Sequence, residues 1–128
     1  MSQTILAKLV ACAALAVLVA PASALAGDAA AGKTKYDMFC ASCHGPTGKG
    51  DGPVAIAIQP PPRDLSAGAF KFDTDDSGEP GTDDDLRNVI TNGASKYGGN
   101  VMMAPWLGAL TEDDISNVIA YIRSLKTE

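Results

Sequence analysis

Two cysteines and a histidine stand close enough in the sequence to hold one cofactor. Cys40 and Cys43 are separated by two residues, and His44 follows the second cysteine directly. Two thiols at this spacing can form thioethers with the two vinyl groups of one porphyrin, and the adjacent imidazole then lies under the iron. The pattern predicts one haem c per chain, attached at Cys40 and Cys43, with His44 as the proximal iron ligand.

Three other uses of such a cysteine pair compete with haem attachment. They are a thioredoxin-like dithiol, half of a zinc site and a disulfide. The dithiol lacks its usual βαβ surroundings, and His44 is the only histidine, so a zinc site has too few ligands. An immediately following histidine is not typical of a structural disulfide, and haem attachment is therefore favoured.

The sixth iron ligand has to come from another residue type, because His44 is the only imidazole. The soft thioether of methionine suits ferrous iron and raises the reduction potential. Met38 is too near Cys40 to reach the other haem face, whereas Met102 and Met103 lie in a distant segment that contains glycine and proline. We expect one of these two to bind the iron, and the alternative is that both pack in the core.

Residues 1–26 have the composition of a secretory signal peptide. Lys8 precedes the apolar stretch 9–19, and Ala24 and Ala26 provide small residues at the two cleavage positions for a cut after Ala26. The alternatives are an uncleaved anchor, which would need a longer apolar run, and a lipoprotein modified at Cys12, whose preceding apolar run is too short. We therefore predict cleavage after Ala26 and a periplasmic location.

The mature chain, residues 27–128, has the length of one domain. The net charge of −5 becomes −6 when Lys8 leaves with the signal peptide, and haem propionates would make it more negative. This balance argues against nucleic acid and favours redox protein partners with basic surfaces. We expect no stable membrane insertion after the signal peptide has been cleaved.

Helical patterns account for the regular structure that the sequence predicts. The expected helices run from an Asp28 cap to Phe39, from a Thr82 cap to Asn92, and from a Thr111 cap to Leu125, with a short turn at 54–58. No segment shows sustained alternation of apolar and polar residues. The predicted fold is all-α, with three to four short helices and long loops wrapped around one haem.

Three features together resemble the class I monohaem cytochromes c of bacteria. They are the segment Cys40–Gly45, the segment Met103–Trp106 and the closing helix, and the likeness covers essentially the whole mature chain. In that family a proline usually follows the methionine ligand directly, whereas Ala104 intervenes here. Counting back from Trp106 favours Met103, and Met102 is the second choice.

The resemblance also implies how several other residues act. The first and last helices should cross, with Gly32 and Tyr36 meeting the closing helix near Val118, Ala120 or Tyr121. A proline carbonyl, best matched by Pro53, should accept a hydrogen bond from His44. Arg63, Tyr97 and Trp106 are candidate donors to the haem propionates, and their alternative roles are a solvated charge and packing.

Acidic residues gather between Asp73 and Asp85, which raises the possibility of a calcium loop. The run lacks the terminal glutamate of that motif, and part of it caps a predicted helix. We therefore do not predict a calcium site.

Taken together, these features predict a single-electron carrier with His/Met-ligated haem, and not an enzyme. Two alternatives stay open: a haem-containing subunit of a larger periplasmic oxidoreductase, and a haem enzyme or gas-binding protein whose sixth ligand is displaceable.

Overall fold

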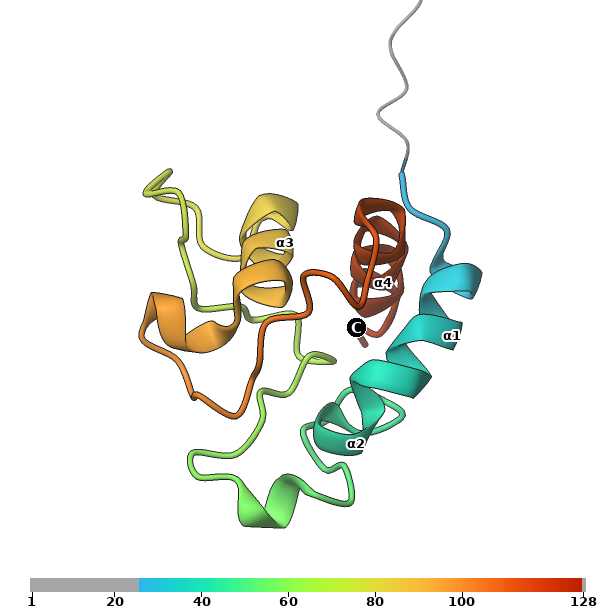
Figure 1. Ribbon diagram of the computed structural model, residues 1–128, viewed down its shortest axis with the longest axis vertical. Coiled ribbons are helices and arrows are strands. Elements are labelled where there is room, and N and C mark those ends of the chain that lie inside the picture. The colour runs from blue at the N-terminus through green and yellow to red at the C-terminus, as the bar shows by residue number, and fades with distance from the viewer. Residues whose placement is uncertain (1–25, 128) are drawn as a thin grey trace, which may run out of the picture.

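The computed structural model describes residues 26–127, and the regular structure in this range is helical (Figure 1). The predicted signal peptide lies outside the described residues except for Ala26. Within them no strand forms, and a single isolated bridge joins Leu107 to Leu110, so the all-α prediction is confirmed. The elements are the helices α1 (Ala29–Phe39), α2 (Ala41–His44), α3 (Asp83–Asn92) and α4 (Glu112–Ser124), with the 3₁₀ turns η1 (Ala55–Ala57) and η2 (Ala94–Tyr97).

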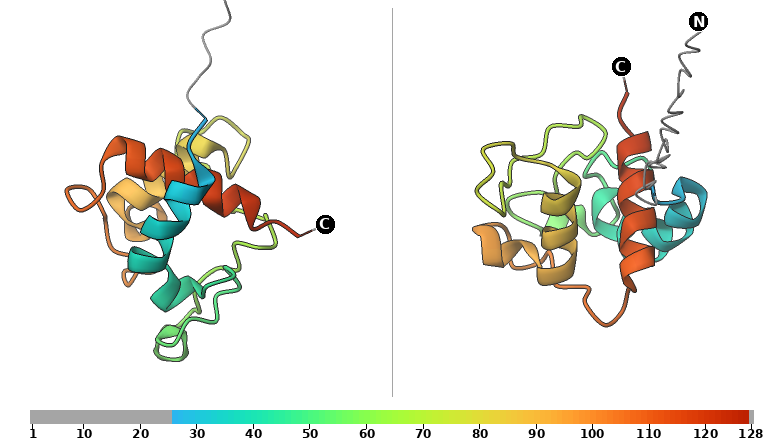
Figure 2. Two further views of the ribbon diagram at one scale, coloured as in Figure 1. Left: turned by 90° about the vertical axis from the view of Figure 1, so that its right-hand side faces the viewer. Right: turned by 90° about the horizontal axis from the view of Figure 1, so that it is seen from above.

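Helix α1 begins at the predicted cap and lies across α4. The Asp28 carboxylate accepts hydrogen bonds from the amides of Ala30 (2.8 Å) and Ala31 (3.1 Å). The left view of Figure 2 shows the two helices crossing. Gly32 lies at the crossing, where a Cβ atom would collide with the main chain of Asn117. Only glycine allows the helices to approach so closely, and the predicted crossing is confirmed.

Helix α4 provides much of the core. Thr111 is the predicted cap, and together with Asp114 it forms both hydrogen bonds of a capping box. The apolar residues that follow at helical spacing face α1 and α3, and Ile115 and Val118 are completely buried. The core residues are Tyr36, Leu65, Leu86, Ile90, Leu110, Ile115, Val118, Ile119 and Ile122.

Helix α3 packs beside α4 and leads the chain toward residues 98–106. This stretch, the methionine segment, contains both candidate ligands, Met102 and Met103. It begins at the predicted Thr82 cap, and Arg87 ties it to α4 by donating to Glu112 (3.0 Å) and Ser116 (3.1 Å). Gly93 follows the helix with φ +80° and ψ 154°. The turn that ends α3 therefore combines a positive φ, which favours glycine, with an extended ψ.

Long loops connect these helices, as the sequence predicts. The chain from Gly45 to Thr82 contains only the turn η1, which confirms the short turn expected at 54–58. The turn η2 does not follow from the sequence pattern, because the glycines and proline between residues 93 and 108 favour a loop. No helix among the described residues combines the length and the apolar character needed to cross a bilayer.

The helix crossing predicts that replacing Gly32 by alanine lowers the stability of the protein, although the same change in a free helix usually raises it. Gly32→Ala should destabilise the protein by about 1–3 kcal/mol, because the methyl group meets the α4 main chain. Helix propensity alone predicts a gain of about 0.5–1 kcal/mol. Urea unfolding of the haem-loaded protein, followed by far-ultraviolet circular dichroism, measures the difference. Thr34→Ala on the exposed face of α1 is the control, and a stabilised Gly32→Ala variant would refute the close crossing.

Candidate haem site

One helical turn brings Cys40, Cys43 and His44 to the same side of the chain. The amides of Cys43 and His44 both donate to the carbonyl of Cys40, at 3.2 Å and 2.9 Å. Side chains three and four residues apart lie on one face of a helix. Both cysteines are half-buried free thiols, and all three side chains line one cavity. The competing disulfide is therefore not formed.

Tyr36 of α1 holds the end of the Cys40–His44 turn in place. Its fully buried hydroxyl donates to the carbonyl of Gly45 (2.8 Å), and its ring packs edge to face on Tyr121 at 4.9 Å between centroids. The Gly50 amide donates to the His44 carbonyl (2.8 Å) from the following loop. These contacts hold the end of α2 between α1, α4 and the loop, so the direction of the His44 side chain is set by packing.

A main-chain carbonyl holds the His44 ring, but it belongs to a different residue from the one predicted. The Nδ1 atom lies 3.0 Å from the carbonyl oxygen of Arg63. Pro53 is exposed and lies outside the cavity wall, so its assignment as the acceptor is wrong. The reason is local: the Val54 amide donates to Ser42 and turns the chain around the end of α2. The three prolines before Arg63 instead favour an extended backbone that brings its carbonyl to the ring.

This hydrogen bond and the burial of the ring determine which form of His44 is available to a metal. When Nδ1 donates to the Arg63 carbonyl, Nε2 is left as the ligand atom. Burial lowers the pKa of His44, and the hydrogen bond to Arg63, which acts in the opposite direction, does not offset it. The neutral imidazole that metal binding requires is therefore the favoured form in the fold.

The thiol of Cys40 is also affected by its surroundings. Burial raises the pKa of Cys40 to about 12, and the nearby Cys43 adds to the increase. The sulfur is consequently a neutral thiol at pH 7 in the folded chain without cofactor. A thiol, and not a charged thiolate, is what a largely apolar cavity wall accommodates.

The cavity beside these residues has a volume of about 460 Å³. Sites for organic cofactors commonly occupy about 300–1,000 Å³, and their walls are mostly apolar. The walls carry two free thiols, an imidazole and two methionine thioethers, and this donor set fits a covalently attached haem. The apolar wall includes Phe39, Leu65, Phe70, Leu86, Ile90 and Trp106.

Both candidate methionines line the cavity, but their environments differ. Met102 is 63% exposed, whereas Met103 is half-buried and packs against the core. The carbonyl of Met103 accepts from the Ala94 amide (3.0 Å), and its amide donates to the Asn100 carbonyl (3.1 Å). A Cβ atom at Gly93 would lie 3.0 Å from the Met103 oxygen. Glycine at that position therefore lets the methionine segment pass close to the end of α3.

The three candidate propionate donors do not all reach the cavity. Arg63 and Trp106 line it, and Arg63 also donates to the carbonyl of Ala69 (2.9 Å). Tyr97 is not part of the wall, because its hydroxyl accepts a hydrogen bond from Asn92 at the end of α3 (3.0 Å). The cavity therefore brings Cys40, Cys43, His44, Arg63, Met102, Met103 and Trp106 together and leaves Pro53 and Tyr97 outside.

Sequence reasoning missed a second cation on the cavity wall. Lys71 lines the cavity between Phe70 and Phe72, with its ammonium 4.8 Å from the Phe72 ring centroid. Among the described residues that form the wall, Arg63 and Lys71 are the cations. The alternation of aromatic and charged residues at 70–72, within an otherwise polar loop, was the signal that could have identified it.

A helical domain with two thiols and an imidazole on one cavity wall is typical of a protein that binds haem covalently. The chain belongs to the cytochrome c family, because the model of the family described as "Cytochrome c" matches residues 29–126. The cofactor is accordingly a covalently bound c-type haem with its iron.

Two known proteins are similar to this chain. Cytochrome c-554(547) of Halothiobacillus neapolitanus is 39% identical over 103 residues, which cover 79% of this chain and all of that protein. A solved structure of the reducing HAO-like protein complex of Kuenenia stuttgartiensis is similar at 36% identity with a TM-score of 0.63. The match covers 75% of this chain and 41% of that one, so the present chain corresponds to less than half of that protein.

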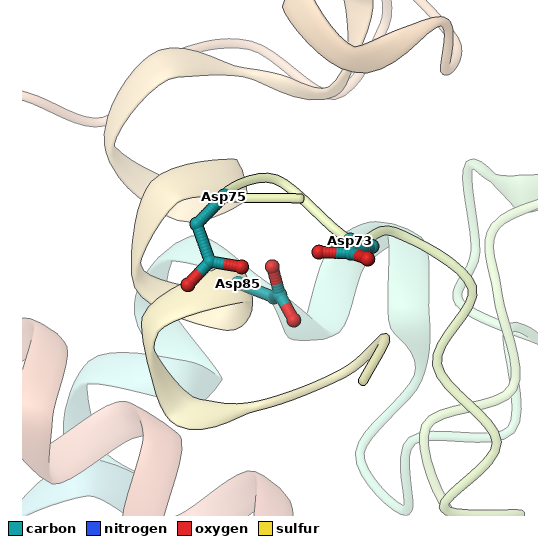
Figure 3. Close-up of side chains that lie close together, drawn as sticks. All are labelled: Asp73, Asp75 and Asp85. Carbon is teal, nitrogen blue, oxygen red and sulfur yellow. The ribbon is translucent and has the colours of Figure 1, made fainter. Parts of the chain in front are cut away.

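The acidic run between Asp73 and Asp85 forms a cluster away from the cysteines. Figure 3 shows the carboxylates of Asp73, Asp75 and Asp85 side by side, with ligand atoms within 4.8 Å of one another. Asp85 is 1% exposed, and its oxygens accept four hydrogen bonds from the amides and hydroxyls of Thr74 and Thr82, at 2.5–2.9 Å. These bonds give the cluster a structural role, which is to hold the 73–82 loop on α3.

The hydrogen bonds to Asp85 predict a pH-dependent loss of stability. Burial alone would raise the pKa of Asp85, but the donors from Thr74 and Thr82 outweigh it and hold the pKa well below its usual range. The ionised carboxylate therefore contributes stability that is present above the ordinary aspartate pKa of about 3.9 and is lost as the pH falls through the folded pKa. Asp85→Asn should cost about 2 kcal/mol at neutral pH.

Urea unfolding of the wild type and Asp85→Asn across the acid range tests this prediction. The difference in unfolding free energy should shrink as the pH falls below the ordinary aspartate pKa. Asp84→Asn, an exposed change in the same helical turn, is the control. A difference that is constant with pH would mean that the Asp85 charge is not what stabilises the loop.

Proposed function

We propose that this chain is a single-electron carrier in which Cys40 and Cys43 hold the haem and His44 and Met103 bind its iron. The observation that carries the proposal is that one cavity receives the thiols and imidazole of the Cys40–His44 turn together with Met103 from the segment after η2. Haem iron supplies the chemistry by alternating between the ferrous and ferric states. The chain attaches the haem, sets its axial ligands and excludes water with an apolar wall.

Met103 is the preferred ligand because its main chain is fixed on both sides. Hydrogen bonds to Ala94 and Asn100 hold its carbonyl and its amide, and its side chain packs against the core. Met102 is largely exposed. Adjacent residues direct their side chains differently, so one of the two serves as the ligand. We expect Met102 to cover the edge of the haem.

Two filled axial positions leave no open site for a substrate, which favours a carrier over an enzyme. The haem also explains the large loop content, because it provides the apolar centre that a domain of this size lacks. Arg63 and Lys71 on the cavity wall are suitable partners for the propionate groups, since buried carboxylates require cations or hydrogen-bond donors.

We further propose that residues 1–26 direct export and are removed, leaving residues 27–128 as a periplasmic cytochrome domain. The basis is the leader composition described above. Export also places the cysteine pair in the compartment where c-type haem attachment takes place in bacteria, as the family resemblance implies.

The protein partner is proposed to have a basic surface. The segment 73–85 carries seven acidic residues and no lysine or arginine. Several of them are exposed, including Asp75, Asp76 and Glu79. Opposite charge on a partner would steer encounter. The segments 52–62 and 97–111 have no charged residues, so close contact near the methionine segment would be apolar.

A second candidate function keeps the same chemistry but makes the chain a fixed subunit of a larger oxidoreductase. The observation that favours it is the similarity to part of a chain from the reducing HAO-like complex. Purification of the native protein under mild conditions separates the two functions. A free carrier elutes at the mass of one chain, whereas a subunit elutes with stoichiometric partners.

The axial ligand assignment is tested by comparing Met103→Ala with Met102→Ala. Met103→Ala should abolish the near-infrared charge-transfer band of thioether-bound ferric iron, lower the reduction potential and permit carbon monoxide to bind. Met102→Ala should retain the band. Loss of the band only in Met102→Ala would reverse the assignment. If wild-type protein binds carbon monoxide readily, the alternative of an enzyme or gas-binding protein replaces the carrier.

The proposal that the partner has a basic surface is tested by the salt dependence of electron transfer. The rate of transfer to the protein that co-purifies with this chain is measured by stopped flow. The rate should fall roughly tenfold as salt rises, because screening removes electrostatic steering. The triple variant Asp75→Asn, Asp76→Asn, Glu79→Gln should lose most of this dependence. The double variant Asp28→Asn, Asp113→Asn, which removes two negative charges at the start of α1 and in α4, is the control and should keep the dependence. A rate that is flat or rises with salt in the wild type would contradict the proposal.

A further inference from the structure

The side chain of Asn100 makes three hydrogen bonds beside the haem cavity. Its Nδ2 atom donates to the carbonyls of Gln59 (3.0 Å) and Pro60 (3.2 Å), and its Oδ1 atom accepts from the Met102 amide (2.9 Å). Carbonyl groups only accept and an amide N–H only donates, so this network is compatible with one orientation of the side-chain amide. Asn100 therefore uses both ends of its amide group at once.

These bonds join two parts of the cavity wall that are about forty residues apart in the sequence. Pro60, Pro61 and Pro62 form one part of the wall, and the next residue is Arg63, whose carbonyl holds His44. Asn100, Met102 and Met103 form the other part. Figure 1 shows the loop after η2 descending toward the segment that follows η1. Asn100 thus connects the support of the proximal ligand to the segment of the proposed distal ligand.

The methionine segment is held differently on its two sides. On the α3 side, the Met103 carbonyl accepts from Ala94, and the Trp106 amide donates to Ile90 at 3.0 Å. On the proline side, the hydrogen bonds between segments 54–63 and 98–106 within the described chain all come from Asn100. Among the described residues, the Asn100 side chain alone therefore joins the methionine segment to the proline segment by hydrogen bonds.

We infer that Asn100 is a positioning residue that keeps the methionine segment closed over the haem and thereby controls how readily Met103 leaves the iron. The inference rests on the proposed Met103 ligation. Without the two Nδ2 donors, the carbonyls of Gln59 and Pro60 have to bond to water, which favours separation of the two walls. The open form then gains population, and its iron has a free position.

Two variants of Asn100 separate this role from general destabilisation. Asn100→Ala removes all three hydrogen bonds. Asn100→Asp is nearly isosteric and keeps the acceptor for Met102, but its ionised carboxylate cannot donate and faces two carbonyl oxygens. When that carboxyl is protonated it regains one O–H donor. Asn88→Ala is the matched control, because the Asn88 amide joins α3 to Thr74 at 2.9 Å away from the cavity.

The experiment measures carbon monoxide binding to the ferrous holoprotein, the reduction potential and the charge-transfer band as functions of pH. Asn100→Ala should bind carbon monoxide roughly tenfold faster than the wild type at every pH, since net hydrogen bonds of this kind change an equilibrium by about that factor. Its potential should be lower. Asn100→Asp should behave like Asn100→Ala at neutral pH and recover wild-type binding as the pH falls into the range where the introduced carboxyl protonates.

The outcomes distinguish this inference from the proposed function. If Met103→Ala loses the band and Asn100→Ala matches the Asn88→Ala control in rate and potential, the positioning role is wrong while Met103 ligation stands. If Asn100→Asp does not recover wild-type carbon monoxide binding as the pH falls, the positioning role of Asn100 is also wrong. If Met103→Ala keeps the band, the ligand assignment fails first, and the positioning role fails with it.

Discussion

The arrangement of this protein depends on the close contact between α1 and α4. Gly32 brings the α1 backbone against α4, and from that contact α1 carries its last residues, and then α2, to the edge of the cavity. Tyr36, buried in the same contact, bonds to Gly45 just after the cysteine turn. Two thiols and an imidazole hold one rigid cofactor only if their own helix is fixed. The helix crossing supplies this rigidity although it contains no ligand.

The two axial sides of the proposed haem site are built on different physical principles. The proximal side is local, since Cys40, Cys43 and His44 belong to one turn and need only one outside contact, the Arg63 carbonyl. The distal side is a segment without regular structure, held by main-chain hydrogen bonds to Ala94 and by the Asn100 side chain. A segment held in this way opens more easily than a helix packed in the core. With Met103 as the proposed ligand, exchange at the iron is therefore expected on the methionine side.

Charge is distributed to suit both structure and encounter. Within the acidic segment, Asp85 is buried and bonds to Thr74 and Thr82, whereas neighbouring carboxylates remain exposed. The segments that flank the methionines carry no charge. Long-range attraction and short-range contact can thus be supplied by different surfaces. This division suits a carrier that has to find its partner and then leave it, because strong charge pairs at the contact would slow dissociation.

The sequence by itself determined the cofactor, the all-α class and the ends of the main helices, because these follow from short-range chemistry. The spacing of Cys40, Cys43 and His44 is a local property, and so are the caps at Asp28, Thr82 and Thr111. Tertiary structure alone decided which carbonyl meets His44, that Tyr97 lies outside the cavity, and that Asn100 joins two loops. Those contacts link residues brought together by long loops, whose paths depend on the packing of the whole chain and leave no periodic pattern in the sequence.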